Sequence, residues 1–551
     1  MPLSSLVHRS LCFEITRNLL VALIAAAPLV AMIPTVHAQT SAKTRTQAPT
    51  SRSESFPVSS VFKVNVRLVV LDVVVTDKAG KPVDGLTSKD FHIFEDGKLQ
   101  RIRSVESPAA HTLPPVSAAA GIAAAFDPAE PSSFGHSPVD VLVLDQLNTH
   151  FADSSFGRRS LHDYLMSQPA LLREPTTLLT VYDDHFKLLQ TFTRDRDAVL
   201  RALDAAPVEY PWKLEVNGKT EYGPVERLDQ SLRLLEQIAQ SYARITGRKN
   251  VIWVGGGFPT INPTTIDRGD ALEVKDTLKH ITDVLLDSHV TLYAVDPSSS
   301  AAGMTEITDS SQMEFVLTAG DALTGGIDPF GASDDFDRLG PVTGGRVVRG
   351  RNDIAQQIAS SVDLGTHFYT IAYSPTSANE AAAQYRSIHV ICTRPGLAAS
   401  TRSGYYSGET QQEKSTANAA YDLTTAAQSA IPLNGIRVTV EKDTTPGAPP
   451  GAYMVHAAAA NLTWQPKGDG ASTAAVYIMS VSLDGKNRML GHTLRGMKAN
   501  ARPEADLKDP AKMADFSIAV PDVQHETTIR FVVLDKASGR MGSIDLPQKM
   551  R

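Results

Sequence analysis

Short apolar runs of strand length recur between residues 137 and 375, and each ends abruptly in a polar or glycine-rich turn. The run that starts at Val139 ends at Asp145, a second run ends at Gly255, and a third ends at Asp296. Continuous apolar runs of this length are typical of strands buried on both faces of a parallel sheet. The turns that follow such strands lie along one edge of the sheet, where ligand sites are usually found.

Segments with helical periodicity separate these runs. The clearest apolar stripe recurs at intervals of three and four residues, at Leu228, Leu232, Leu235, Ala239 and Tyr242. Such spacing predicts a long amphipathic helix. The strand–helix alternation therefore predicts an α/β domain over residues 137–375, with a doubly wound, mostly parallel sheet.

All-β patterns flank this domain. Short alternating strands with Gly and Asp turns predict a small β module over residues 58–106, followed by a Pro/Ala/Ser-rich linker over 107–136. A β segment at 376–408 follows the domain, and one hypothesis is that it pairs with 58–106, which would make the α/β domain an insertion. After a polar linker at 409–434, strands return over 435–551 in the pattern of a β-sandwich.

The N-terminus has the pattern of a cleaved export signal. Arg9 and Arg17 precede an apolar run over residues 19–33, and Val36-His37-Ala38 offers a small-residue cleavage site. The predicted signal peptide is residues 1–38, and 39–57 form a polar linker. The alternative is a retained anchor, but the run is shorter than the roughly 20 apolar residues that span a bilayer. We therefore expect an exported protein, periplasmic, envelope-associated or secreted, with no membrane span after cleavage.

The net charge and the cysteine content exclude one class of partner and an internal disulfide. The net charge of −7 argues against a nucleic-acid partner. Of the two cysteines, Cys12 leaves with the signal, so Cys392 has no partner for an internal disulfide. Its strand-like surroundings predict a small buried residue.

Four sequence segments, taken together, resemble the von Willebrand factor A (VWA) domain, whose fold is a doubly wound α/β sheet similar to the Rossmann fold. They are the strand ending at Asp145, residues 247–254, residues 290–296, and Thr343-Gly344-Gly345. More narrowly, the chain resembles the exported VWA-related proteins typical of acidobacteria, in which a β module precedes the A-like domain. The resemblance covers roughly residues 58–408.

The resemblance implies a metal-ion-dependent adhesion site that holds Mg²⁺ or Mn²⁺ through oxygen ligands. Asp145 and Thr149 match the first and third positions of its first loop, whereas Leu147 replaces the middle Ser. The later Asp of the family is replaced by glycines after Trp253. The candidate metal ligands are Asp145, Asn148, Thr149 and Asp183.

A second interpretation of the same residues needs no metal. Asp145 is then a strand-end acid that accepts backbone N–H groups, Asn148 and Thr149 form a local turn, and Asp183 belongs to a solvated hairpin turn. No Gly-x-Ser-x-Gly or His-Glu-x-x-His motif occurs in the sequence, and the glycines after Trp253 lack the Lys of a phosphate loop. We therefore expect no catalytic residues and no cofactor-binding residues.

The function expected from these features is protein–protein binding or adhesion in the cell envelope, to an unidentified protein partner. Two alternatives remain open, a metal-assisted hydrolase that uses Asp145 and a passive structural protein of the envelope.

Overall fold

The computed structural model describes residues 68–548 apart from 114–125, 129–130, 217–222, 260–267, 299–338, 376–383, 408–415, 430, 468–470, 486–487, 503–506, 510 and 522. The predicted signal peptide and the linker that follows it lie outside the described residues. No helix in the described part of the chain is both long and apolar enough to cross a membrane.

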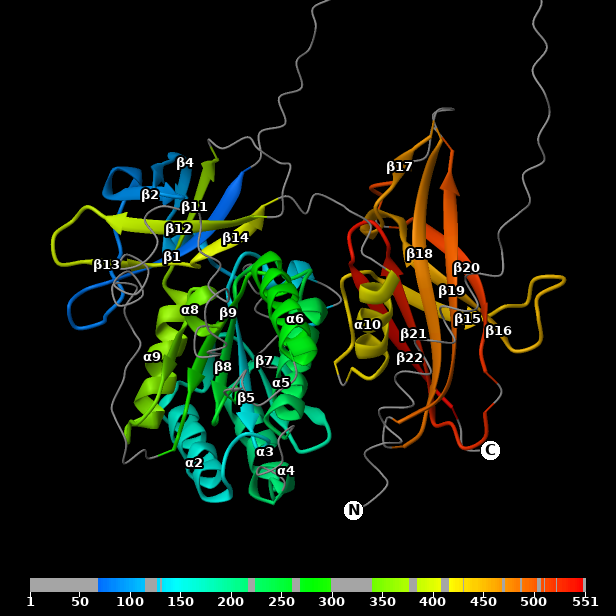
Figure 1. Cartoon of the computed structure of the whole chain (residues 1–551), viewed down its shortest axis with the longest axis horizontal. Coiled ribbons are helices and arrows are strands. Elements are labelled where there is room, and N and C mark those ends of the chain that lie inside the picture. The colour runs from blue at the N-terminus through cyan, green and yellow to red at the C-terminus, as the bar shows by residue number, and fades with distance from the viewer. Residues whose placement is uncertain are drawn as a thin grey trace, which may run out of the picture. The chain divides into compact units, whose positions relative to one another are not determined.

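A six-stranded sheet forms the centre of the α/β region (Figure 1). Its strand order is β10-β9-β8-β5-β6-β7, and all neighbours are parallel except β7, which pairs antiparallel with β6. The strands are β5 (Val139–Asp145), β6 (Leu171–Val181), β7 (Phe186–Asp195), β8 (Lys249–Val254), β9 (Val290–Val295) and β10 (Arg346–Val348). Every residue of β5, β8 and β9 is buried, as the continuous apolar runs predict.

Helices cover both faces of this sheet (Figure 1). Successive residues of β5 point to opposite faces: Leu142 packs with α2, α3 and α9, whereas Val143 packs with α5 and α6. The helices are α2 (Phe151–Ser167), α3 (Arg196–Ala205), α4 (Trp212–Glu215), α5 (Gly223–Ser241), α6 (Arg268–Asp287), α8 (Leu339–Val342) and α9 (Ile354–Thr366). The region is therefore an α/β fold with a mostly parallel sheet.

Two small sheets make up the β module, and both combine strands from before and after the α/β region. One has the order β13-β1-β11-β4 and the other β14-β12-β2-β3. Buried residues from the two sheets, such as Leu71 and Ile93, share one core. The strands are β1 (Val69–Thr76), β2 (Phe91–Glu95), β3 (Lys98–Leu99), β4 (Arg101–Glu106), β11 (Tyr369–Ser374), β12 (Gln384–Cys392), β13 (Ala398–Ser400) and β14 (Gly404–Ser407).

Strand β11 falls within residues 137–375, predicted as the α/β domain, but it does not join the α/β sheet. It lies between β1 and β4, antiparallel to both. Its alternate residues Tyr369, Ile371 and Tyr373 are buried in the core of the β module. The apolar residues of β11 thus belong to the β module, so the α/β region ends structurally with α9.

The C-terminal region contains two antiparallel sheets with a shared core. One sheet is β15-β16-β20, and the other is β17-β18-β21-β22 with β19 paired to β18. Buried residues such as Val455 and Phe531 contribute to the core between them. The strands are β15 (Val438–Lys442), β16 (Ala452–Ala458), β17 (Gln465–Pro466), β18 (Ser472–Leu483), β19 (Met489–Ala501), β20 (Met513–Ala519), β21 (Thr528–Asp535) and β22 (Met541–Pro547).

The segment 409–434, expected to be a linker, contains helix α10 (Thr416–Ala427). Leu423 and Ala426 of this helix pack with Met479 and Val532 on the second sheet of the C-terminal region. The segment is therefore more than a linker. A helix of this length is marginally stable alone, and packing on the sheet, which the local sequence does not show, stabilises it.

Candidate functional site

Asp145 ends β5 at the carboxyl edge of the six-stranded sheet, and its side chain is completely buried. Its Oδ1 accepts hydrogen bonds from the backbone N–H groups of Leu147 and Asn148, each at 2.9 Å. Its Oδ2 accepts from the Trp253 indole N–H at 2.9 Å and from the Gly257 N–H at 3.3 Å. Burial raises the pKa of Asp145 to about 6 even though these donors oppose the shift. Four N–H donors thus surround the carboxylate.

The glycines after Trp253 allow the loop to approach Asp145 closely. A Cβ at Gly255 would lie 2.4 Å from the Asp145 Cβ, and a Cβ at Gly256 would lie 1.9 Å from the Asn148 carbonyl oxygen. Gly256 N–H also donates to the Thr149 Oγ1 at 2.8 Å. The glycine run therefore closes the loop over the end of β5, and it brings N–H donors to the acid rather than a second carboxylate.

Asn148 contacts Arg227 of helix α5, a residue not identified from the sequence. The Arg227 Nε donates to the Asn148 Oδ1 at 3.2 Å, and the Asn148 amide donates to the Ser231 Oγ at 2.9 Å. Arg227 is only 5% exposed, and burial lowers its pKa, while the charges of Asp145 and Asp183 act in the opposite direction. A protein cation thus supplies positive charge near the predicted metal ligands.

Asp183 and Gln146 hold the chain segment 207–216, which follows α3. The Asp183 Oδ2 accepts from the Lys213 N–H at 3.0 Å, and burial raises the pKa of Asp183. Gln146 accepts from the Glu209 N–H at 3.0 Å and donates to the Pro207 carbonyl at 3.2 Å. Arg227 also donates to the Lys213 carbonyl at 3.2 Å. The polar residues at the strand ends therefore act as anchors for this segment.

The anchored segment presents exposed aromatic side chains beside the start of α2. Phe151, Tyr210 and Trp212 are 42%, 41% and 61% exposed. Their rings form a chain, with centroids 5.8 Å apart between Phe151 and Tyr210 and 4.8 Å apart between Tyr210 and Trp212. Glu215 accepts from the Phe151 N–H at 3.3 Å and pairs with the His150 Nδ1 at 3.0 Å, which fixes α2 to the segment. We call Phe151, Tyr210 and Trp212 the aromatic patch.

Hollows at this edge differ in size. A void next to Gly256, Asp296 and Arg349 has a volume of about 10 Å³, room for about one water molecule. The Asp296 carboxylate there pairs with Arg349 at 2.9 Å. An open groove of about 330 Å³ lies between α2 and the segment after α3, with Arg158 and Val208 in its lining. The larger hollow, the open groove, thus lies beside segment 207–216.

Each of the four predicted ligands has a side-chain oxygen that accepts a hydrogen bond from a protein N–H group. Among the described residues, three His or acidic side chains come within ligand distance of one another at Glu236, His280 and Asp422, and this group contains neither Asp145 nor Asp183. A metal at Asp145 would have to displace N–H donors from both carboxylate oxygens. This geometry favours the interpretation of Asp145 as a turn acid. Metal binding at this position stays a prediction.

Two features of the site were missed in the sequence. Arg227 starts a second buried stripe of α5 that continues through Ser231, Leu234 and Ile238. A charged residue on the buried face of a predicted helix could have been recognised as a site residue, because Arg is rarely buried without a partner. The aromatic patch was harder to predict, because a segment without helical or strand periodicity does not show which of its aromatic residues are exposed.

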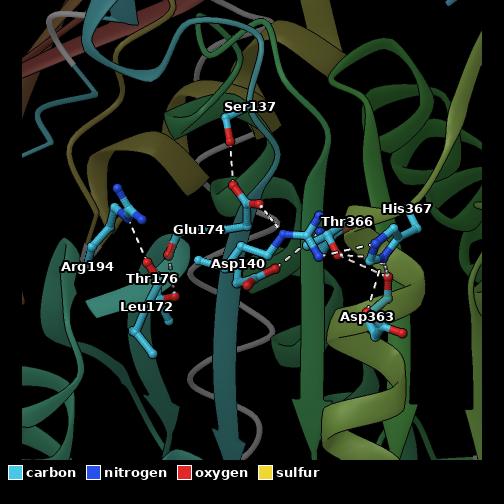
Figure 2. Close-up of polar contacts among 11 residues, drawn as sticks. Ser137, Asp140, Leu172, Glu174, Thr176, Arg194, Asp363, Thr366 and His367 are labelled. Atoms are coloured by element: carbon cyan, nitrogen blue, oxygen red, sulfur yellow. Dashed lines mark hydrogen bonds and ion pairs between the residues drawn. The ribbon is translucent and has the colours of Figure 1, made fainter. Parts of the chain in front are cut away.

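A second group of buried acids lies at the opposite, amino edge of the sheet (Figure 2). Burial raises the pKa of Asp140 to about 8, and the neighbouring charge of Glu174 acts in the same direction. The Asn250 amide donates to the Asp140 Oδ1 at 3.1 Å, and Ser137 donates to Glu174. Both carboxyl groups are buried. Ligand sites in such sheets usually lie at the carboxyl ends of the strands, and these two acids lie at the other edge. Their position is therefore typical of a structural rather than a binding role.

Comparison with known proteins adds little to this picture. No family model matches the chain, and no curated protein matches it. Among solved structures, the chain is similar to the structure titled "Crystal Structure of the SpRpn10 VWA domain", with 14% sequence identity and a TM-score of 0.15. The match covers 30% of this chain and 89% of that chain. A TM-score this low carries no argument about function.

Proposed function

We propose that this protein binds a protein partner through the aromatic patch at the carboxyl edge of its α/β region. The observation that supports the proposal is the exposed ring chain of Phe151, Tyr210 and Trp212. Tyr and Trp are over-represented among the residues that contribute most to protein–protein binding energy. An exposed aromatic cluster on an otherwise polar surface marks an interaction site more often than a scattered apolar residue does.

The anchoring of the patch supports a binding role. Segment 207–216 is held at Pro207, Glu209 and Lys213 by Gln146, Asp183 and Arg227. A surface that is ordered before the partner arrives loses little conformational freedom on binding. In this proposal the buried polar residues at the strand ends position the patch, and the aromatic rings contact the partner.

We further propose that the role is binding rather than catalysis and that it takes place outside the cytoplasm. The first part is supported by Asp145, whose carboxylate is surrounded by donors and completely buried. A general base or a nucleophile needs access to its substrate. The second part is supported by the signal-like pattern of Arg9, Arg17 and the apolar run after them.

Affinity capture from the native cell envelope tests the proposal. The wild-type protein is compared with the double variant Tyr210→Ser/Trp212→Ser and with the control Leu99→Ser, which removes another exposed apolar side chain at 57% exposure. We expect a specific protein to be recovered with the wild type and the control, and its recovery to fall at least about tenfold with the double variant. Equal recovery with the double variant would contradict the proposal.

A further inference from the structure

Three side chains from three helices meet in a cluster that the binding proposal does not use. Glu236 lies on α5, His280 on α6 and Asp422 on α10, and one potential ligand atom from each lies within 4.8 Å of the others. Both carboxyl groups are completely buried, whereas the side chain of His280 is 23% exposed. The cluster therefore has a buried acidic side and an accessible imidazole side.

The distances fit a shared cation better than a set of hydrogen bonds. The His280 Nε2 lies 3.4 Å from the Glu236 Oε1 and 3.4 Å from the Asp422 Oδ1. One ring N–H can point well at only one acceptor, and 3.4 Å is long for such a bond. Zinc bonds of about 2.0–2.1 Å in a tetrahedral arrangement separate neighbouring ligand atoms by about 3.3–3.4 Å.

Charge and hydrogen bonding at Glu236 point in the same direction. A divalent cation with a neutral imidazole would compensate the negative charge of two carboxylates that lie this close together. The Glu236 Oε2 is buried and has no hydrogen-bond partner among the described residues. The Glu236 Oε1 accepts from the Gln240 amide at 2.8 Å, the kind of contact that orients a ligating carboxylate.

We propose that Glu236, His280 and Asp422 bind a divalent transition-metal ion, with zinc as the best match. An imidazole with two carboxylates is a donor set that suits zinc better than magnesium or calcium, which take oxygen ligands. His280 is the partly exposed member of the cluster, so in this proposal the ion enters, and water completes its coordination, from the side of His280.

The site would join two parts of the fold. Glu236 and His280 lie on the helices that cover the six-stranded sheet, and α10 packs on the β18–β21 face of the C-terminal region. A metal bound by all three residues would hold α10 to α5 and α6. Its role in this proposal is structural, and it is independent of the aromatic patch.

Zinc binding by the purified full-length chain tests the proposal. The protein is stripped with a chelator, and zinc affinity is then measured by competition with a chromophoric chelator, with metal content measured by mass spectrometry. We expect one zinc per chain, binding of Co²⁺ but not of Mg²⁺ to the stripped protein, and an affinity loss of more than about 100-fold for His280→Gln and for Asp422→Asn. Zinc is also expected to raise the thermal midpoint of the wild type.

A matched control is available in the C-terminal region. His456 also lies between two acids, with its Nδ1 2.7 Å from Asp515 and its Nε2 3.5 Å from Glu441, but both acids are exposed. His456→Gln should bind zinc as the wild type does. Glu236→Gln, checked for folding by circular dichroism, is a third variant that should lose zinc. The absence of stoichiometric zinc in the wild type, or unchanged affinity in the folded variants, would overturn the proposal and leave His280 as an imidazolium between two acids.

Discussion

At the residue scale, Asp145 fits two interpretations, a metal ligand and a turn acid. A carboxylate at the end of a buried strand is placed where a metal ligand would be, yet its two oxygens accept N–H groups from three different parts of the chain. Leu147 and Asn148 are local donors, as the interpretation of Asp145 as a turn acid predicts, whereas Trp253 and Gly257 lie more than 100 positions away. The position of Asp145 and its local partners were predictable, but its distant partners were not.

Asp145→Asn should lower the free energy of unfolding by about 2–4 kcal/mol. The new amide would bring a donor to face either the Trp253 indole N–H or the N–H groups of Leu147 and Asn148. Urea denaturation at pH 7 measures the change. Addition of Mg²⁺ or Mn²⁺ should leave the difference between the two proteins unchanged. Stabilisation of the wild type alone by these ions would instead support a metal at Asp145.

Asp140 should make stability depend on pH. Its pKa is raised to about 8, so the native state retains a proton that the unfolded chain releases. Unfolding therefore releases a proton between about pH 4 and pH 8, and the contribution of Asp140 to stability falls as the pH rises through this range.

The variant Asp140→Asn isolates this effect, because the amide oxygen can still accept from Asn250. We expect the variant to gain stability over the wild type as the pH rises, reaching about 1–3 kcal/mol at pH 8 and much less at pH 5. Denaturation curves at the two pH values measure the gain. A gain that does not change with pH would show that Asp140 is ionised throughout.

At the scale of elements, the glycine loop after β8 determines how closely the strand-end turns pack. Gly256→Ala should cost about 2 kcal/mol or more, because the new Cβ would meet the Asn148 carbonyl oxygen at 1.9 Å. Gly485→Ala is the control, since its nearest neighbour would be a methyl group at 4.0 Å. Chemical denaturation of both variants measures the cost. Equal stability of the two variants would mean that the loop can move away from Asp145.

The elements of the α/β region could be predicted because continuous apolar runs such as Val139–Asp145 are hard to interpret as anything but buried strands. Two elements could not be assigned. The apolar alternation of β11 predicts a strand but does not say which sheet it joins, because pairing with β1 spans about 300 residues. Helix α10 depends on a sheet face formed by later residues. The predicted site residues lie along one edge of the sheet, as their positions after the strands suggest, whereas the aromatic patch became visible only in the three-dimensional structure.

At the scale of the whole molecule, the β module encloses the α/β region in sequence. Strand pairs such as β2 with β12 and β4 with β11 join a strand before the α/β region to a strand after it. Closing the β module therefore requires pairing of strands that the whole α/β region separates in sequence, which slows folding. The boundaries of any shorter fragment therefore determine whether its strands keep their partners.

A fragment of residues 58–408 should fold cooperatively, whereas residues 137–375 should expose apolar surface. In the shorter fragment Tyr369, Ile371 and Tyr373 lose β1 and β4 as partners. Residues 137–367, which end before β11, are the control and should be better behaved. Dye binding and size-exclusion chromatography distinguish the three fragments. A monomeric 137–375 fragment without dye binding would contradict the assignment of β11 to the β module.

The central claim is that the aromatic patch contacts a partner while the buried acids only position it. Site-specific photo-crosslinking tests this most directly, with the crosslinking side chain placed at Trp212 and, as a control, at Leu99. Both positions are exposed, at 61% and 57%. We predict a discrete crosslinked protein from the Trp212 position in the native envelope and none from the Leu99 position. The same crosslinks from both positions, or none from Trp212, would contradict the account.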